Sequence, residues 1–140
     1  MRLIHSKLRK NGKKRRGAEV VEMALLMLPL LWLTFGAIDF GWYFYLQHNL
    51  EGAARNGVRR AILSSSSNAD AQASVDKIMN ASGFKSGAYT VTFEPSDISS
   101  AAQGTEVKVT VSMAYAPMGI PPARVPNKTV TGVAIMLKEW

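Results

Sequence analysis

The longest hydrophobic pattern of the chain lies near its N-terminus. Sixteen uncharged residues form Met23–Ile38, and after Asp39 a second apolar stretch, Phe40–Leu46, follows. As one helix, residues 23–46 extend about 36 Å at about 1.5 Å per residue, enough to cross a hydrocarbon core of about 30 Å. The pattern therefore predicts a membrane-spanning helix. The alternative is a buried core helix, but so short a chain has no amphipathic segments to cover it.

Two residues interrupt this apolar pattern. Pro29 is expected to kink the helix, which membrane helices tolerate because neighbouring groups can satisfy the freed carbonyl. Asp39 would cost on the order of 3 kcal/mol at the bilayer centre. We therefore place it in the outer interface, beside an aromatic belt of Trp42, Tyr43 and Tyr45. A role with a partner inside the membrane is the alternative.

The helical pattern continues beyond the predicted span. Apolar residues recur at four-residue steps, and charged residues recur beside them. Small residues also recur, at Ala53, Gly57 and Ala61, and they allow close approach either of a second helix or of the chain's own folded domain. The apolar series is Leu46, Leu50, Ala54, Val58 and Ile62.

The remaining residues predict a small domain, termed here the head. The polar run Ser64–Asn68 separates it from the long helix. Ser67 and Asp70 then have the spacing of a helix start, and Gly83 is expected to end that short helix. Its apolar face consists of Val75, Ile78 and Met79.

Three strands are predicted after the short helix. Residues 89–93 and 107–115 alternate between apolar and polar side chains, as half-buried strands do. Residues 129–138 are apolar on both faces towards their end, so we expect this strand to be central. The loop 117–128 contains four prolines and is either a surface crossover or a contact surface. The fold class is therefore α+β: a long N-terminal transmembrane helix and a small antiparallel sheet with a short helix.

The charge of the chain is concentrated in its first residues. The net charge is +7, but residues 1–16 hold eight basic residues and no acid, while the rest holds nine basic and ten acidic residues. A basic tail before an apolar span places the N-terminus in the cytoplasm and the head outside. The tail alone does not indicate a nucleic-acid partner.

The residue types also argue against an enzyme. The absence of Cys excludes disulfides, thiol catalysis and a Cys-ligated zinc site, and there are only two histidines, His5 and His48. There is no phosphate-binding glycine loop, zinc-binding helix motif or nucleophile elbow. We therefore expect no enzymatic activity, no metal, no cofactor and no small-molecule substrate.

A distinctive junction precedes the apolar run. It reads Lys13-Lys14-Arg15-Arg16-Gly17-Ala18-Glu19-Val20-Val21-Glu22, so that a basic leader ends in glycine and a glutamate follows just before the span. This junction resembles the signal of type IV pilins. With Pro29, Asp39 and the later Ala53-Ala54-Arg55, the segment is similar to TadE-like pseudopilins of Tad (Flp, tight-adherence) pilus systems.

The resemblance implies how the chain is processed and assembled. A prepilin peptidase would cut after Gly17, so that Ala18 carries a new α-amine. Glu22 would pair with the amine of a neighbouring subunit, where an isolated ion pair in a low-dielectric bundle sets axial register. Residues 1–17 would be the leader, 18–63 the transmembrane and stalk helix, and 64–140 the extracytoplasmic head.

The resemblance also implies a function. The chain would be a minor pilin of a Tad-type pilus or secretion machine, inserted once in the bacterial inner membrane. Its partners would be the prepilin peptidase, other pilin subunits, an inner-membrane assembly platform and membrane lipid, with no nucleic acid. The alternative is an uncleaved, membrane-anchored binding protein.

Overall fold

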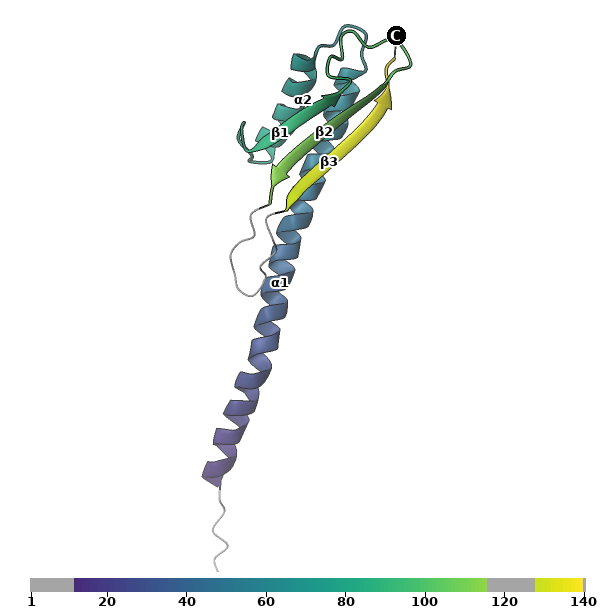
Figure 1. Cartoon of the computed structure of the whole chain (residues 1–140). Helices are drawn as coiled ribbons and strands as arrows, with labels where there is room; N and C mark the ends of the chain where they lie inside the picture. The colour runs from purple at the N-terminus through teal and green to yellow at the C-terminus, as the bar shows by residue number, and fades with distance from the viewer. Residues whose placement is uncertain (1–11, 116–127, 140) are drawn as a thin grey trace, which may run out of the picture. The chain divides into compact units, whose positions relative to one another are not determined.

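The computed structural model describes residues 12–115 and 128–139 of the chain. It contains two helices and one antiparallel sheet (Figure 1), which confirms the predicted α+β fold. The elements are α1 (Gly12–Ala61), α2 (Asn68–Ala81), β1 (Tyr89–Glu94), β2 (Glu106–Ala114) and β3 (Thr129–Leu137). Most of the predicted leader and the loop 117–127 lie outside the described residues. The chain divides into two compact units, one ending at Ala37 and the other beginning at Ile38.

The core of the second unit is built on the later part of α1. All five residues of the predicted four-residue series, from Leu46 to Ile62, are buried. The small residues face the same domain. A Cβ on Gly57 would lie 2.6 Å from Val75 Cγ2 in α2 and 3.3 Å from Val109 Cγ1 in β2. Of the two alternatives for these small residues, packing on the chain's own domain is correct.

The short helix α2 begins and ends as its sequence predicts. Ser67 caps its start, and the Ser67 and Asp70 side chains each accept a backbone N–H of the other residue. The helix ends at Ala81, and Gly83 follows with a left-handed φ of 86°. Its buried residues are Ala71, Val75 and Met79.

Side-chain hydrogen bonds attach the end of α2 to α1. The Ser82 hydroxyl donates to Asn49 Oδ1 at 2.6 Å, and the Tyr45 hydroxyl donates to the Ser82 carbonyl at 3.1 Å. The two partners on α1, Tyr45 and Asn49, are one helical turn apart and lie beside Leu46, the first residue of the buried four-residue series. Both helices lie on the same face of the sheet (Figure 1).

The sheet order corrects one prediction. The strands are arranged β1-β2-β3, so that β2 is central and β3 is an edge strand. The prediction that the third strand is central was wrong. It assumed that apolar residues on both faces imply burial on both faces, yet Val133, Ile135 and Leu137 are 44–63% exposed on the outer face. Only the inner face of β3 meets the helices.

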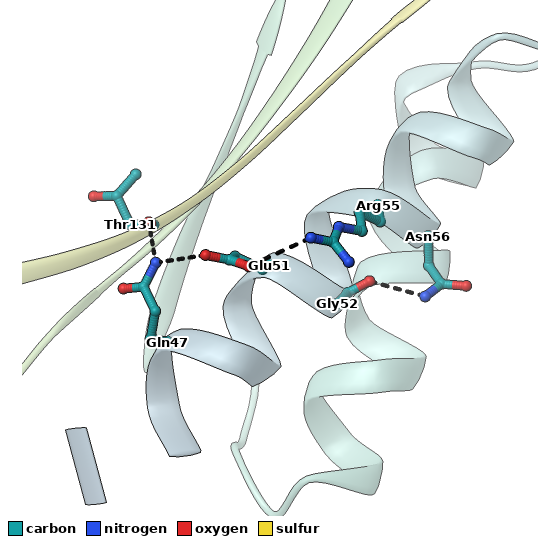
Figure 2. Close-up of polar contacts among 6 residues, drawn as sticks. All are labelled: Gln47, Glu51, Gly52, Arg55, Asn56 and Thr131. Atoms are coloured by element: carbon teal, nitrogen blue, oxygen red, sulfur yellow. Dashed lines mark hydrogen bonds and ion pairs between the residues drawn. The ribbon is translucent and has the colours of Figure 1, made fainter. Parts of the chain in front are cut away.

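The contact between β3 and α1 is a contact between backbones. A Cβ on Gly132 would lie 2.5 Å from the backbone nitrogen of Glu51, which is closer than real Cβ contacts allow. Beside this contact, Figure 2 shows Gln47 Nε2 donating to Glu51 Oε1 at 3.0 Å and to the Thr131 carbonyl at 3.3 Å. Glu51 also pairs with Arg55 at 3.5 Å. Glycine at position 132 is what lets the edge strand reach the helix.

We predict that Gly132→Ala destabilises the second unit. The added methyl group would meet helix backbone, which cannot rotate away, and overpacking of this kind costs about 1–3 kcal/mol. Urea unfolding of the full chain in mild detergent, followed by circular dichroism, measures the change. The matched control is Gly52→Ala in α1, where a Cβ meets nothing within 4 Å. Equal stability of the two variants would contradict the close contact.

We predict a second, pH-dependent effect at Tyr89. Burial, together with the hydrogen bond that its hydroxyl donates to Asp76 Oδ1 at 2.7 Å, raises the pKa of Tyr89 to about 12. Because the folded pKa lies above the unfolded value near 10, the contribution to stability is present below pH 10 and is lost as the pH rises towards 12. The free-energy difference between wild type and Tyr89→Phe should therefore shrink across this range. A difference independent of pH would show that the hydroxyl is not held in its neutral form.

Candidate functional site

The predicted cleavage junction lies inside a continuous helix. Gly17 and Ala18 are helical residues of α1, and both are exposed. A Cβ on Gly17 would meet nothing within 4 Å, so the junction is open on the surface. Glycine costs about 1 kcal/mol in a helix relative to alanine, which lowers the free energy needed to unwind the helix here. A protease that binds an extended substrate would need that local unwinding.

Glu22 lies on the same helix face as Ala18. The two residues are four apart, and residues at this spacing are neighbours on a helix surface. Glu22 is exposed. The placement brings the carboxylate one turn from the predicted new N-terminus, but it leaves the carboxylate pointing outward, where a group from another molecule can reach it.

The helix that follows displays its apolar side chains on its surface. From Val20 to Leu33 every large hydrophobic residue is exposed, at 46–72% of its full area. Within Gly17–Ala61 lies a window long and apolar enough to cross a membrane, and none of that window is buried in the structure. This stretch has the length and composition of a membrane anchor or a signal.

Pro29 lies within α1, which continues on both sides of it. Because proline has no N–H, the carbonyl of Leu25, four residues earlier, lacks its usual helix donor. One turn later, the Thr34 hydroxyl donates to the Leu30 carbonyl at 2.8 Å, so this polar side chain is satisfied by its own helix. In lipid such internal pairing lowers the cost of a hydroxyl.

Asp39 lies against the folded domain of the second unit. The Tyr115 hydroxyl, after the end of β2, donates to the Asp39 carbonyl at 3.4 Å. Burial raises the pKa of Tyr115, and its hydrogen bond with the Asp39 side chain raises this pKa further. Asp39 is half-buried. Its partner is therefore a residue 76 positions later in the same chain.

The aromatic residues after Asp39 also have partners in the domain. Tyr43 packs edge-on against Tyr115 with ring centres 5.6 Å apart. Trp42 stacks on Tyr45 at 5.6 Å, and both contact Phe84 at 6.2–6.3 Å. Sequence reasoning missed Phe84 and Tyr115. The available signals were an aromatic residue directly after Gly83 and another at the end of an alternating strand.

The part of the chain that the structure describes contains no group of three His, Asp or Glu residues that could hold a metal ion. The ion pairs in this part of the chain lie at the surface, and each joins one carboxylate to one basic side chain. They join Glu51 to Arg55, Asp70 to Arg60, and Glu94 to Lys108.

The family comparison agrees with the geometry of α1. Residues 17–59 match the model of the TadE-like protein family. Over these residues the chain is similar to TadE-like proteins. The TadE-like segment begins at Gly17, the predicted end of the leader, and ends two residues before α1 does. It includes Glu22, Pro29 and Asp39, and it stops before α2 and the sheet.

Comparison with curated proteins and with solved structures finds no match to the chain. The TadE-like assignment therefore rests on α1. The account of the sheet and its contacts rests on the structure itself.

Proposed function

We propose that this TadE-like protein is a minor pilin of a Tad-type pilus or secretion machine. The observation that carries the proposal is one helix with two properties. It matches the TadE-like family from Gly17 onward, and its apolar side chains stay exposed to Leu33. The protein would wait in the bacterial inner membrane and enter or prime a filament through this helix.

The exposed apolar helix supplies the driving force for assembly. Exposed apolar surface costs about 25 cal/mol per Å² in water, so this stretch needs either lipid or the helices of neighbouring subunits around it. Small residues let membrane helices approach closely, and Ala37 and Gly41 are both exposed on α1. Ala53, Gly57 and Ala61 are buried against the chain's own domain and do not take part. Helix–helix contact in the filament would therefore use residues before Leu46.

Glu22 would set the register of that contact. Cleavage after Gly17 leaves a positively charged amine on Ala18, and the exposed carboxylate of Glu22 on a neighbour is its natural partner. A charge held in the membrane without a partner is costly. Only axial positions that bring amine and carboxylate together would then be stable.

The basic residues before Gly17 complete the proposed topology. They keep the N-terminus in the cytoplasm, where the prepilin peptidase acts, and the second unit lies outside. The other partners would be pilin subunits, an inner-membrane platform and membrane lipid. The role is structural, and we propose no enzymatic activity and no nucleic-acid partner.

A second candidate is favoured by one observation. The backbone is helical on both sides of Gly17, so the junction is not already in an extended form. An uncleaved, single-pass membrane protein with an external binding domain would keep this continuous helix.

The N-terminus of the protein distinguishes the two functions. We expect protein purified from native membranes to begin at Ala18 by intact mass and sequencing. Gly17→Leu should leave the chain starting at Met1, because a bulky side chain blocks close approach to the backbone. A native chain that begins at Met1, in cells containing an active prepilin peptidase, would favour the anchored binding protein.

A charge substitution tests assembly separately from processing. Glu22→Ala should leave membrane insertion unchanged and lower the yield of sheared filaments by about tenfold or more, which requires a loss of only about 1.4 kcal/mol per subunit contact. Glu19→Ala is the matched control, since it removes an exposed carboxylate from the same region of α1. If both variants assembled like wild type, amine pairing would be wrong.

A further inference from the structure

One end of the sheet gathers around α1 just after the apolar run. The pairing register brings the start of β1, the end of β2 and the start of β3 to this end, since Tyr89 pairs with Met113 and Ala114 pairs with Thr129. We call it the proximal end; in Figure 1 it is the end of the sheet towards which the arrow of β2 points. The opposite end, with the end of β1, the start of β2 and the end of β3, is the distal end.

Two lysines flank α1 at the proximal end. Lys85 directly follows Phe84, whose ring contacts Trp42 and Tyr45. The Lys128 carbonyl accepts the backbone N–H of Tyr115 at 2.8 Å, and Tyr115 contacts Tyr43 and Asp39. Both lysines are exposed. They therefore lie beside the same two turns of α1, which contain residues 39–45.

The helix exposes aromatic side chains at this level. Phe40 is 67% exposed, Phe44 is 59% exposed and Tyr45 is 45% exposed. We define the proximal rim as the exposed residues Phe40, Phe44, Tyr45, Lys85 and Lys128. Exposed aromatic rings with nearby lysines are the residues that favour the boundary between lipid and water.

The two ends of the sheet differ in the exposed charges that they carry. At the distal end and beside it, four exposed carboxylates lie together with exposed Arg59 and Arg60 and half-buried Lys108. Among the described residues of the proximal end, Asp39 and Asp76 are half-buried and hydrogen-bonded to Tyr115 and Tyr89, whereas Lys85 and Lys128 are exposed. Both charged side chains of the proximal rim are therefore cationic, which suits contact with lipid phosphate. The distal carboxylates are Glu94, Asp97, Glu106 and Glu139.

The position of the proximal rim along α1 identifies that surface. At about 1.5 Å per residue, Phe44 lies about 9 Å beyond Ile38, the last residue of the uncharged run. The headgroup region is about 5–8 Å thick on each side of the hydrocarbon core. If Ile38 marks the end of that core, residues 40–43 fall within the headgroup layer, and Phe44 and Tyr45 lie just beyond its outer edge, within reach of it through their long side chains.

We propose that the proximal rim binds lipid headgroups, preferring an anionic bilayer, and that it holds the second unit directly on the outer membrane surface without a free helical spacer. The inference rests on the proposed membrane insertion of α1. It adds a lipid-binding surface on the folded domain, with Lys85 and Lys128 contacting lipid phosphate and the rings of Phe40 and Phe44 lying in, or at the outer edge of, the headgroup layer.

The absence of cysteine from the chain allows a direct test by single-site labelling. Full-length protein is reconstituted in equimolar phosphatidylcholine and phosphatidylglycerol vesicles with a fluorophore at one introduced cysteine. Ala88→Cys reports on the proximal rim, since its N–H donates to the Lys85 carbonyl. Ala102→Cys is the matched distal control, also exposed, and Leu31→Cys reports on insertion.

Quenchers attached to lipid headgroups should remove most of the fluorescence of the label at position 88 and leave the label at position 102 unaffected. Acyl-chain quenchers should act on the label at position 31. Replacing Lys85 and Lys128 with glutamine should reduce quenching at position 88. The control, Arg59→Gln with Lys108→Gln, removes two distal cations and should not.

The outcomes separate this inference from the proposed function. If the label at position 31 is in the hydrocarbon and the label at position 88 is in water, the lipid surface is wrong while membrane insertion stands. If position 31 is also in water, insertion fails and the lipid surface fails with it. If position 88 becomes protected only at high protein density in the bilayer, the rim binds a second copy and the lipid assignment is overturned.

Discussion

An apolar helix surface must be covered, and α1 meets this constraint in two different ways along its length. Up to Leu33 the large apolar side chains are exposed, so lipid or neighbouring helices must supply the cover. From Leu46 onward the buried face meets the chain's own sheet and second helix. The hydrophobic effect is the same in both parts. What changes is the source of the covering surface, and that change divides the chain into an exposed apolar helix and a folded domain.

The folded part depends on how closely backbones approach α1. Gly57 admits the side chains of α2 and β2, and Gly132 admits the edge strand itself. At Gly57 valine side chains pack directly on the helix backbone, and at Gly132 the strand backbone meets the helix backbone. Hydrogen bonds add to these close contacts. Gln47 of α1 donates to the Thr131 carbonyl of β3 (Figure 2), and Asn49 of α1 accepts from the Ser82 hydroxyl.

The candidate site is made of residues that are close in sequence. The order of basic leader, Gly17, Glu22 and apolar run can be read along the chain, and the TadE-like match begins at Gly17 and includes Glu22. The roles of these residues stay predictions. The partner of Asp39 could not be read in this way. Tyr115 lies 76 positions later in sequence. Neither the apolar pattern of the helix nor the alternating pattern of the strand specifies that the end of β2 lies beside the turn of α1 that contains Asp39.

The spacing of apolar residues and the positions of turn and capping residues therefore predicted the helices, the three strands and the capped start of α2. Each of these features depends on residues that are neighbours in sequence. The strand order was decided only in three dimensions. Apolar residues on both faces of β3 suggested a central position, but pairing placed β2 in the centre, because the helices cover one face of the sheet alone. Likewise, the sequence predicted that the aromatic residues of α1 form an interfacial group. Only the tertiary structure brought Phe84 and Tyr115 to them, because aromatic contacts of this kind join residues far apart in the chain.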